Sequence, residues 1–215
     1  MEKIKSSSLT EAFEKLNEAE KMLFFKCGQM IKADNGNMYQ VDLLAIGAFK
    51  RTSGNAKGFK LLVESKNMAA SRSLLRVQLD TFLRFSAIAL VDNANEFASK
   101  VLSGEQIRKL KDSKGKQMSD AYLVKTHSKE YDWLQKVYDD LCGYIHFSNK
   151  HIFDSFDSFD DESRKIEFSF GNDDHKYPEY SWVEIADCFT MSLKILFLYI
   201  DAWVDSKANK PIKQD

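Results

Sequence analysis

The chain has 215 residues, of which 44% are hydrophobic and 13% aromatic, and its formal net charge is -1. This is enough apolar material for one sizeable core, so we expect a single helical domain over residues 1–215. The near balance of 31 basic and 32 acidic side chains excludes a strongly basic protein, although a local basic face stays open. Only two prolines and nine glycines occur, which favours long helices.

Three cysteines, Cys27, Cys142 and Cys188, stand far apart in apolar segments. Their odd number and the absence of a CxxC pair predict reduced, buried thiols and a cytoplasmic protein. Residues 1–5 (MEKIK) lead into a polar serine run, and no apolar signal-peptide core follows them. The most apolar late stretch, residues 189–204, contains a lysine and an aspartate, so we expect no membrane span.

The first half of the chain shows helical periodicity. The capping-box spacing from Ser8 to Glu11 predicts a helix that starts near residue 9 and stops at the turn formed by residues 34–37. A second helix should start near Met38, and residues 53–55 either interrupt it or lie within one long helix. A third helix, about residues 68–91, is apolar nearly all round, which places it in the middle of a bundle.

Shorter helices are expected in the middle of the chain. The capping-box spacing at Ser103 predicts a short helix that ends near residue 111. A helical piece is expected over residues 120–125. Ser128 is then expected to cap a helix that carries apolar side chains from Trp133 to Ile145.

The pattern changes period after this helix. Phenylalanines lie among Asp and Ser, and residues 165–170 alternate strictly, so we expect two short strands that form a β-hairpin near residues 152–170. A capping box at Ser181 predicts a last helix over about residues 182–206, followed by a frayed tail at 207–215. The predicted fold is therefore mostly α, a bundle of about five principal helices with an ordered core over residues 8–206 and a small hairpin.

A stripe of charge crosses the third helix. Arg72, Arg76, Asp80 and Arg84 follow one another at i,i+4 spacing on an otherwise apolar helix. Asp80 can pair with Arg76 or Arg84, which leaves at least one guanidinium for another anion. That anion is either a carboxylate elsewhere in the fold or a ligand phosphate. A solvated face or an internal salt-bridge ladder is the structural alternative, and we favour it here.

A second group of polar residues follows the helix capped at Ser128. His146, Ser148, Lys150 and His151 lie within one short segment. The two imidazoles can converge only if the helix ends between them, in which case they would suit acid–base work or phosphate contact. Alternatively, His146 is a packed core residue and His151 caps a helix end. Cys142 and His146 have i,i+4 ligand spacing, but no second ligand pair is evident, so we expect neither a metal nor a cofactor.

These two groups are predicted to meet. A helix as apolar as the third should be buried, and its charges then need polar partners. We therefore predict that Arg76, Asp80, Arg84 and His146 form one polar cluster inside the bundle. Either the cluster is structural, or it borders a cavity and binds a ligand.

Two segments carry a resemblance. Residues 74–84 (LLRVQLDTFLR) and 143–152 (GYIHFSNKHI) resemble an uncharacterised family of bacterial helical proteins with the pattern LLRxQLDxxLR … GYIHxSxKHI, over about residues 38–203. The chain is more loosely similar to the HEPN superfamily of helical bundles, found in toxin–antitoxin and phage-defence systems, many of which are metal-independent RNases. It departs from their signature, an Arg followed four to six residues later by His, because the nearest arginine before His146 is Arg108.

Two hypotheses for the function follow. The favoured one is a non-catalytic helical binding module, accessory to a bacterial defence or stress system. It is favoured because no complete catalytic or nucleotide-binding motif is present. The alternative is a metal-independent RNA-processing or phosphodiester-cleaving enzyme that uses His146, His151 and Arg76. Expected partners are an RNA or nucleotide ligand, no membrane, and a second copy of the chain. The apolar residues expected to form a homodimer interface are Phe24, Phe25, Phe197, Leu198 and Trp203.

Overall fold

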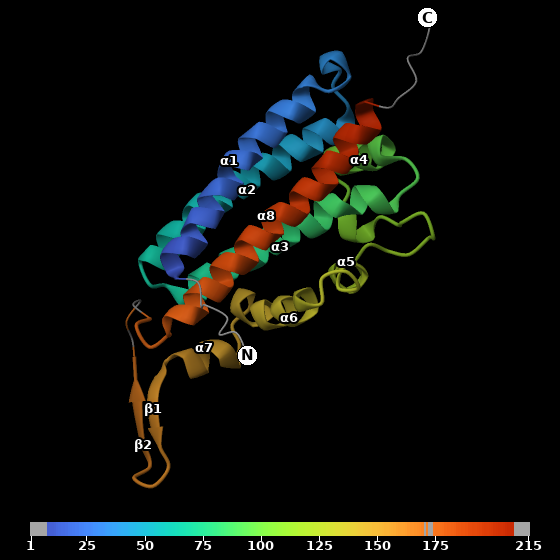
Figure 1. Cartoon of the computed structure of the whole chain (residues 1–215). Helices are drawn as coiled ribbons and strands as arrows, with labels where there is room; N and C mark the ends of the chain where they lie inside the picture. Colours follow the sequence, from blue (N-terminus) through green and yellow to red (C-terminus); the bar gives the residue numbers. More distant parts are fainter. Residues whose placement is uncertain (1–7, 170, 172–173, 209–215) are drawn as a thin grey trace, which may run out of the picture.

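The computed structural model describes residues 8–169, 171 and 174–208. Over these residues the chain forms eight α-helices and one two-stranded antiparallel sheet (Figure 1). The elements are α1 (Leu9–Lys32), α2 (Gln40–Glu64), α3 (Met68–Ser86), α4 (Ala94–Leu102), α5 (Asp120–His127), α6 (Trp133–Ile145), α7 (Asn149–Asp154), β1 (Phe156–Asp160), β2 (Lys165–Phe168) and α8 (Glu179–Ala208). This confirms the predicted fold class, and α1, α2, α3, α6 and α8 are the principal helices.

The bundle is organised around α3. This helix packs against α2, α8, α6 and α5, so its predicted central position is confirmed. On the far side, α1 packs against both α2 and α8. α1 and α8 run in the same direction, because the Leu9 amide donates to Glu179 at 3.1 Å and Lys26 pairs with Asp201 at 2.6 Å (Figure 1). None of the described helices is long and apolar enough to cross a membrane.

The first two helices follow their sequence signals. Ser8 caps α1 in a complete capping box with Glu11. α2 runs without a break through residues 53–55, so the alternative of one long helix is correct. The Asn55 side chain donates to Gln78 of α3 at 3.1 Å, which gives this polar stretch a partner on the neighbouring helix.

Two predicted helix starts are wrong. Ser103 does not open a helix but ends α4, an element missing from the prediction, and only a 3-10 turn at Ile107–Lys109 follows. Asn93 caps α4 instead, since its side chain accepts from the Glu96 amide at 3.1 Å. Ser128 likewise ends α5, and α6 begins five residues later at Trp133. Serine hydroxyls also bond carbonyls of the preceding turn, so a serine spaced like an N-cap can equally close a helix.

The last helix is longer than predicted at both ends. α8 begins at Glu179, ahead of the predicted cap at Ser181, and it continues to Ala208. Lys207, assigned to the tail by sequence, is fully buried and pairs with the fully buried Asp42 at 3.0 Å. The prediction of a tail is therefore wrong at residues 207 and 208, and the remainder, 209–215, lies outside the described residues.

The predicted hairpin is present, but it is smaller than expected. β1 and β2 pair antiparallel with Asp160 opposite Lys165, and they project beyond the end of the bundle, near the start of α8 (Figure 1). Residues 152–154 belong to α7 and not to a strand. Residue 170 lies outside the described part of the chain. Tyr177 donates to Asp154 at 2.5 Å and so connects the segment before α8 to the end of α7.

Candidate functional site

The charged stripe of α3 forms an ion-pair network with α5. Asp80 accepts from Arg84 Nε at 2.8 Å and lies 4.0 Å from the Arg76 guanidinium, one turn away on the same helix. Asp120, at the start of α5, accepts from Arg84 at 2.6 Å and lies 3.9 Å from Arg76. Three of the four predicted cluster members therefore meet, and Asp120 is the carboxylate from elsewhere in the fold that sequence analysis could not name.

Arg51 of α2 joins this network from the solvent side. Its guanidinium lies 3.6 Å from Asp80, and its side chain is 48% exposed. Arg51 borders a hollow of about 170 Å³ between α2, α3 and the end of α6. The residues that line this α3–α6 hollow are Arg51, Arg76, Val77, Asp80, Cys142, Ile145 and His146.

His146 lies at the rim of the α3–α6 hollow and not inside the bundle. It follows the last residue of α6 and its side chain is exposed. The predicted position of His146 in the interior is therefore wrong, although it does border the same hollow as Arg76 and Asp80. Because α6 ends at Ile145, the backbone turns outward there and carries the ring to the surface.

The inner wall of the hollow is fixed by packing against α6. The Arg76 guanidinium lies over the Tyr138 ring, 3.8 Å from its centroid, and donates to the Tyr138 hydroxyl. Arg76 is 12% exposed, and its Nε atom is buried without a hydrogen-bond partner among the described residues. Burial raises the pKa of Tyr138 to about 12, so the phenol is protonated at neutral pH and cannot act as a base.

Two of the other predicted residues lie in a second hollow, between α3, α6 and α8. This hollow, of about 200 Å³, is bordered by Arg72 and Lys150. The Arg72 guanidinium sits between the rings of Tyr144 and Tyr177, at 4.8 and 5.0 Å from their centroids. Lys150 pairs with Asp140 at 2.9 Å. Arg72 therefore lies in a different environment from the other three residues of the α3 stripe.

Ser148 and His151 cap a helix. The Ser148 hydroxyl accepts from the Lys150 amide at 3.2 Å, and the His151 ring accepts from the Ser148 amide at 3.3 Å, which completes a capping box on α7. The His151 ring also stacks on Phe147. His151 does not border the α3–α6 hollow, so His146, His151 and Arg76 do not share one cavity.

His127 has a buried position that the sequence did not reveal. Its Nε2 is 2.7 Å from the Ser86 hydroxyl and its Nδ1 is 3.1 Å from the Tyr199 hydroxyl. Since Ser86 already donates to the Leu83 carbonyl, the ring donates through Nε2 and accepts from Tyr199 at Nδ1. Burial lowers the pKa of His127. The ring is thus a neutral packing element that joins α3, α5 and α8.

Among the described residues, no three His, Cys, Asp or Glu side chains gather in a way that could hold a metal ion. The three cysteines are free, and burial raises the pKa of Cys188 to about 12. This thiol stays protonated at neutral pH and is a poor nucleophile.

Comparisons with known proteins do not assign this chain to a class of protein. No family model matches the chain, and neither a curated protein nor a solved structure matches it. The comparisons therefore show neither the bacterial helical family nor the relationship to the HEPN superfamily that the sequence suggests.

Proposed function

We propose that the chain is a non-catalytic helical binding module that holds the anionic group of a ligand at the mouth of the α3–α6 hollow. One observation carries this proposal. Among the residues that the structure describes, the network contains three guanidinium groups, Arg51, Arg76 and Arg84, but only two carboxylates, Asp80 and Asp120. One positive charge is therefore in excess, and it is most accessible at Arg51, the most exposed member, whose guanidinium lies 3.6 Å from Asp80.

The chemistry of the mouth suits a phosphate-bearing ligand of nucleotide type. A guanidinium presents paired N–H donors that match phosphate oxygens. The exposed His146 ring borders the same hollow and is a further donor. Val77 and Ile145 supply apolar wall, so the ligand should carry an apolar or aromatic part beside its phosphate.

The same geometry favours binding over catalysis. Cleavage of a phosphodiester by the alternative hypothesis needs His146 and His151 on one reacting group, and His151 is used in the α7 cap. Arg76 is held against Tyr138 and cannot swing toward a substrate without losing that contact. These observations support the binding module.

The cellular role is part of the same proposal. The resemblance to helical bundles of toxin–antitoxin and phage-defence systems supports a role accessory to a bacterial defence or stress system. Three free cysteines at separate positions support a reducing compartment, the cytoplasm.

Calorimetric titration with AMP and with inorganic phosphate tests the proposal. The native chain should bind AMP, and Arg51→Gln should weaken binding at least about tenfold, since it removes the exposed charged donor. Lys50→Gln is the matched control, because Lys50 is the exposed neighbour on α2 and does not border the hollow. If the native chain binds neither AMP nor phosphate, or if both variants lose binding equally, the proposal is wrong.

A further inference from the structure

The segment from residue 107 to residue 129 concentrates positive charge. It holds seven basic and only two acidic side chains, a net charge of +5 in a chain whose total is -1. All seven basic side chains are exposed: Arg108, Lys109, Lys111, Lys114, Lys116, Lys125 and Lys129. We call these seven residues the lysine surface. The rest of the chain balances this positive charge. Such a cluster of like charges on one surface is typical of a face that binds a polyanion.

Both acidic side chains of this segment already hold hydrogen bonds within the protein. Asp112 is 8% exposed and accepts from the Tyr122 hydroxyl at 2.5 Å and from the Lys114 and Lys116 amides at 3.0 and 2.7 Å. Asp120 is held by Arg84 in the α3 network. Within the described ranges of the chain, no ion pair holds any of the six lysine ammonium groups.

The loop that presents the lysines is preorganised. The Asp112 amide donates to the Lys116 carbonyl at 2.8 Å, and the Met118 amide donates to the Leu110 carbonyl at 2.9 Å, so the chain doubles back on itself. Met118 is fully buried and anchors the loop to the core. Because the loop is already ordered, a ligand that binds it does not have to offset the entropy of fixing its backbone.

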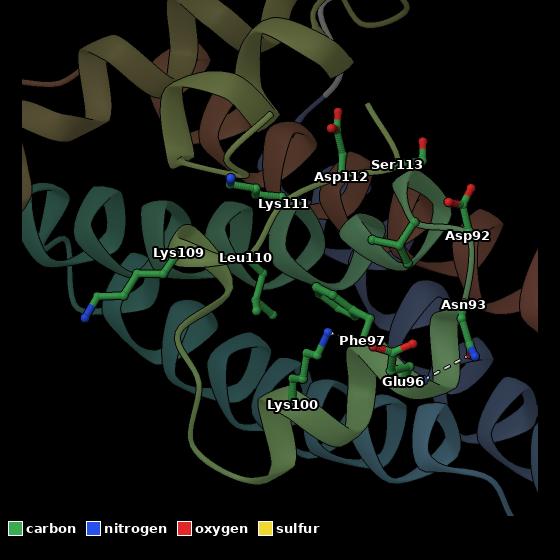
Figure 2. A pocket seen from close by; sticks show the side chains of 11 residues that line it. Asp92, Asn93, Glu96, Phe97, Lys100, Lys109, Leu110, Lys111, Asp112 and Ser113 are labelled. Atoms are coloured by element: carbon green, nitrogen blue, oxygen red, sulfur yellow. Dashed lines mark hydrogen bonds and ion pairs between the residues drawn. The ribbon is translucent and has the colours of Figure 1, made fainter. Parts of the chain in front are cut away.

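The loop forms a ridge between two hollows. One hollow, of about 420 Å³, is bordered by Lys100, Lys109 and Lys111, but also by three acidic side chains: the exposed Asp92, the bonded Asp112, and Glu96, which pairs with Lys100 at 2.7 Å. Figure 2 shows Lys111 above this hollow and Lys109 pointing away from it. The other hollow, of about 470 Å³, is bordered by four lysines and by Asp112, whose carboxylate is already bonded. The four are Lys114, Lys116, Lys125 and Lys129.

We infer that the lysine surface binds single-stranded nucleic acid through its phosphates. Ammonium groups are point charges that attract phosphate without reading the base or the sugar. A flexible strand can follow the ridge and place successive phosphates beside the four lysines of the second hollow, Lys114, Lys116, Lys125 and Lys129. This surface is separate from the α3–α6 hollow, and the inference does not depend on the ligand proposed there.

An anionic membrane fits the observations less well. Peripheral membrane surfaces combine basic side chains with apolar side chains that enter the lipid. None of the exposed large apolar side chains of the described chain lies between residues 107 and 129.

Fluorescence anisotropy with labelled oligonucleotides of about 12 nucleotides tests the inference, at about 50 mM and about 200 mM salt. RNA and DNA strands should bind alike and lose affinity steeply with salt. The variant with Lys114, Lys116, Lys125 and Lys129 all changed to Gln should bind at least about tenfold more weakly than the native chain. The slope of log K against the logarithm of the salt concentration should be smaller in magnitude by up to about 3 in this variant. Asp112 and Tyr122 are unchanged, and a thermal melt checks that this variant is folded.

The control variant is Lys15→Gln/Lys21→Gln on α1, which removes exposed positive charge far from the lysine surface in sequence. It should retain native affinity. The inference is overturned if the native chain binds no oligonucleotide at the lower salt concentration, or if control and quadruple variant weaken binding to the same extent. Binding to phosphatidylserine vesicles without binding to oligonucleotides would overturn it in favour of a membrane surface.

Discussion

The buried pair at the end of α8 gives a quantitative test of the fold. Lys207 Nζ donates to Asp42 and to the Met30 carbonyl, both at 3.0 Å, while Asp42 also accepts from Trp203 Nε1 at 2.8 Å and from the Tyr39 amide at 2.7 Å. The substitution Lys207→Met keeps most of the side-chain volume and removes the charge. It leaves a fully buried carboxylate without its cation.

Removing one partner of a buried pair costs about 3–5 kcal/mol, because the remaining charge is desolvated and uncompensated. For a chain of this size that loss corresponds to a fall in Tm of roughly 6–20 °C. Urea unfolding of Lys207→Met measures it. Lys194→Met, an exposed position on the same helix, should change the free energy of unfolding by no more than about 0.5 kcal/mol. If Lys207→Met stays within about 1 kcal/mol of the native chain, the reasoning about the pair is refuted.

Three further predictions concern other parts of the molecule. Asp80→Ala should lower the free energy of unfolding by about 3 kcal/mol, because it deprives Arg76 and Arg84 of a carboxylate. The exposed control Glu18→Ala should change the free energy of unfolding little. Equal effects of the two substitutions in urea unfolding would contradict this prediction. His127 has a lowered pKa in the folded state, so below about pH 6.5 the unfolded chain binds its proton first and the free energy of unfolding falls as the pH falls. The fall between about pH 7.5 and about pH 5.5 should be smaller in His127→Gln, and an unchanged fall would exclude this ring as its source. Finally, light scattering at micromolar concentration should show a dimer that Phe24→Ser/Phe25→Ser converts to a monomer, and a monomeric native chain would remove the dimer hypothesis.

Periodicity predicted the helices because the side chains that they bury in the core of the bundle are apolar and recur at helical spacing in the sequence. The central position of α3 followed from its apolar surface alone. Helix boundaries were less predictable. A serine such as Ser103 or Ser128 can bond an amide ahead or a carbonyl behind, and only the fold decides which. Lys207 looked like part of a polar tail because its partner, Asp42, lies 165 residues away.

The expected dimer interface shows the same limit. Phe24, Phe25 and Leu198 are exposed, as predicted, but Phe197 and Trp203 are buried. A helical sequence gives the spacing of apolar residues but not which neighbouring helix covers each of them. Since α1 and α2 lie beside α8, Trp203 reaches Asp42 and is taken up in the core.

The site was predictable only along one helix. The i,i+4 spacing of Arg76, Asp80 and Arg84 fixed their contact in advance. Arg51 and Asp120 approach the same network from other helices, and nothing in their local sequence marks them. The lysine surface did carry a signal, a local excess of basic residues, which the balanced total charge concealed.

The central claim is that the mouth of the α3–α6 hollow binds an anion, and NMR of the arginine side chains during an AMP titration tests it most directly. The Nε–Hε resonance of Arg51 and the ring resonances of His146 should shift and saturate together, because both groups border the hollow. The resonance of Arg84, which is bonded to Asp80 and Asp120, should move far less. If the signals of Arg51 and His146 stay unchanged while AMP is added in excess, the claim is contradicted.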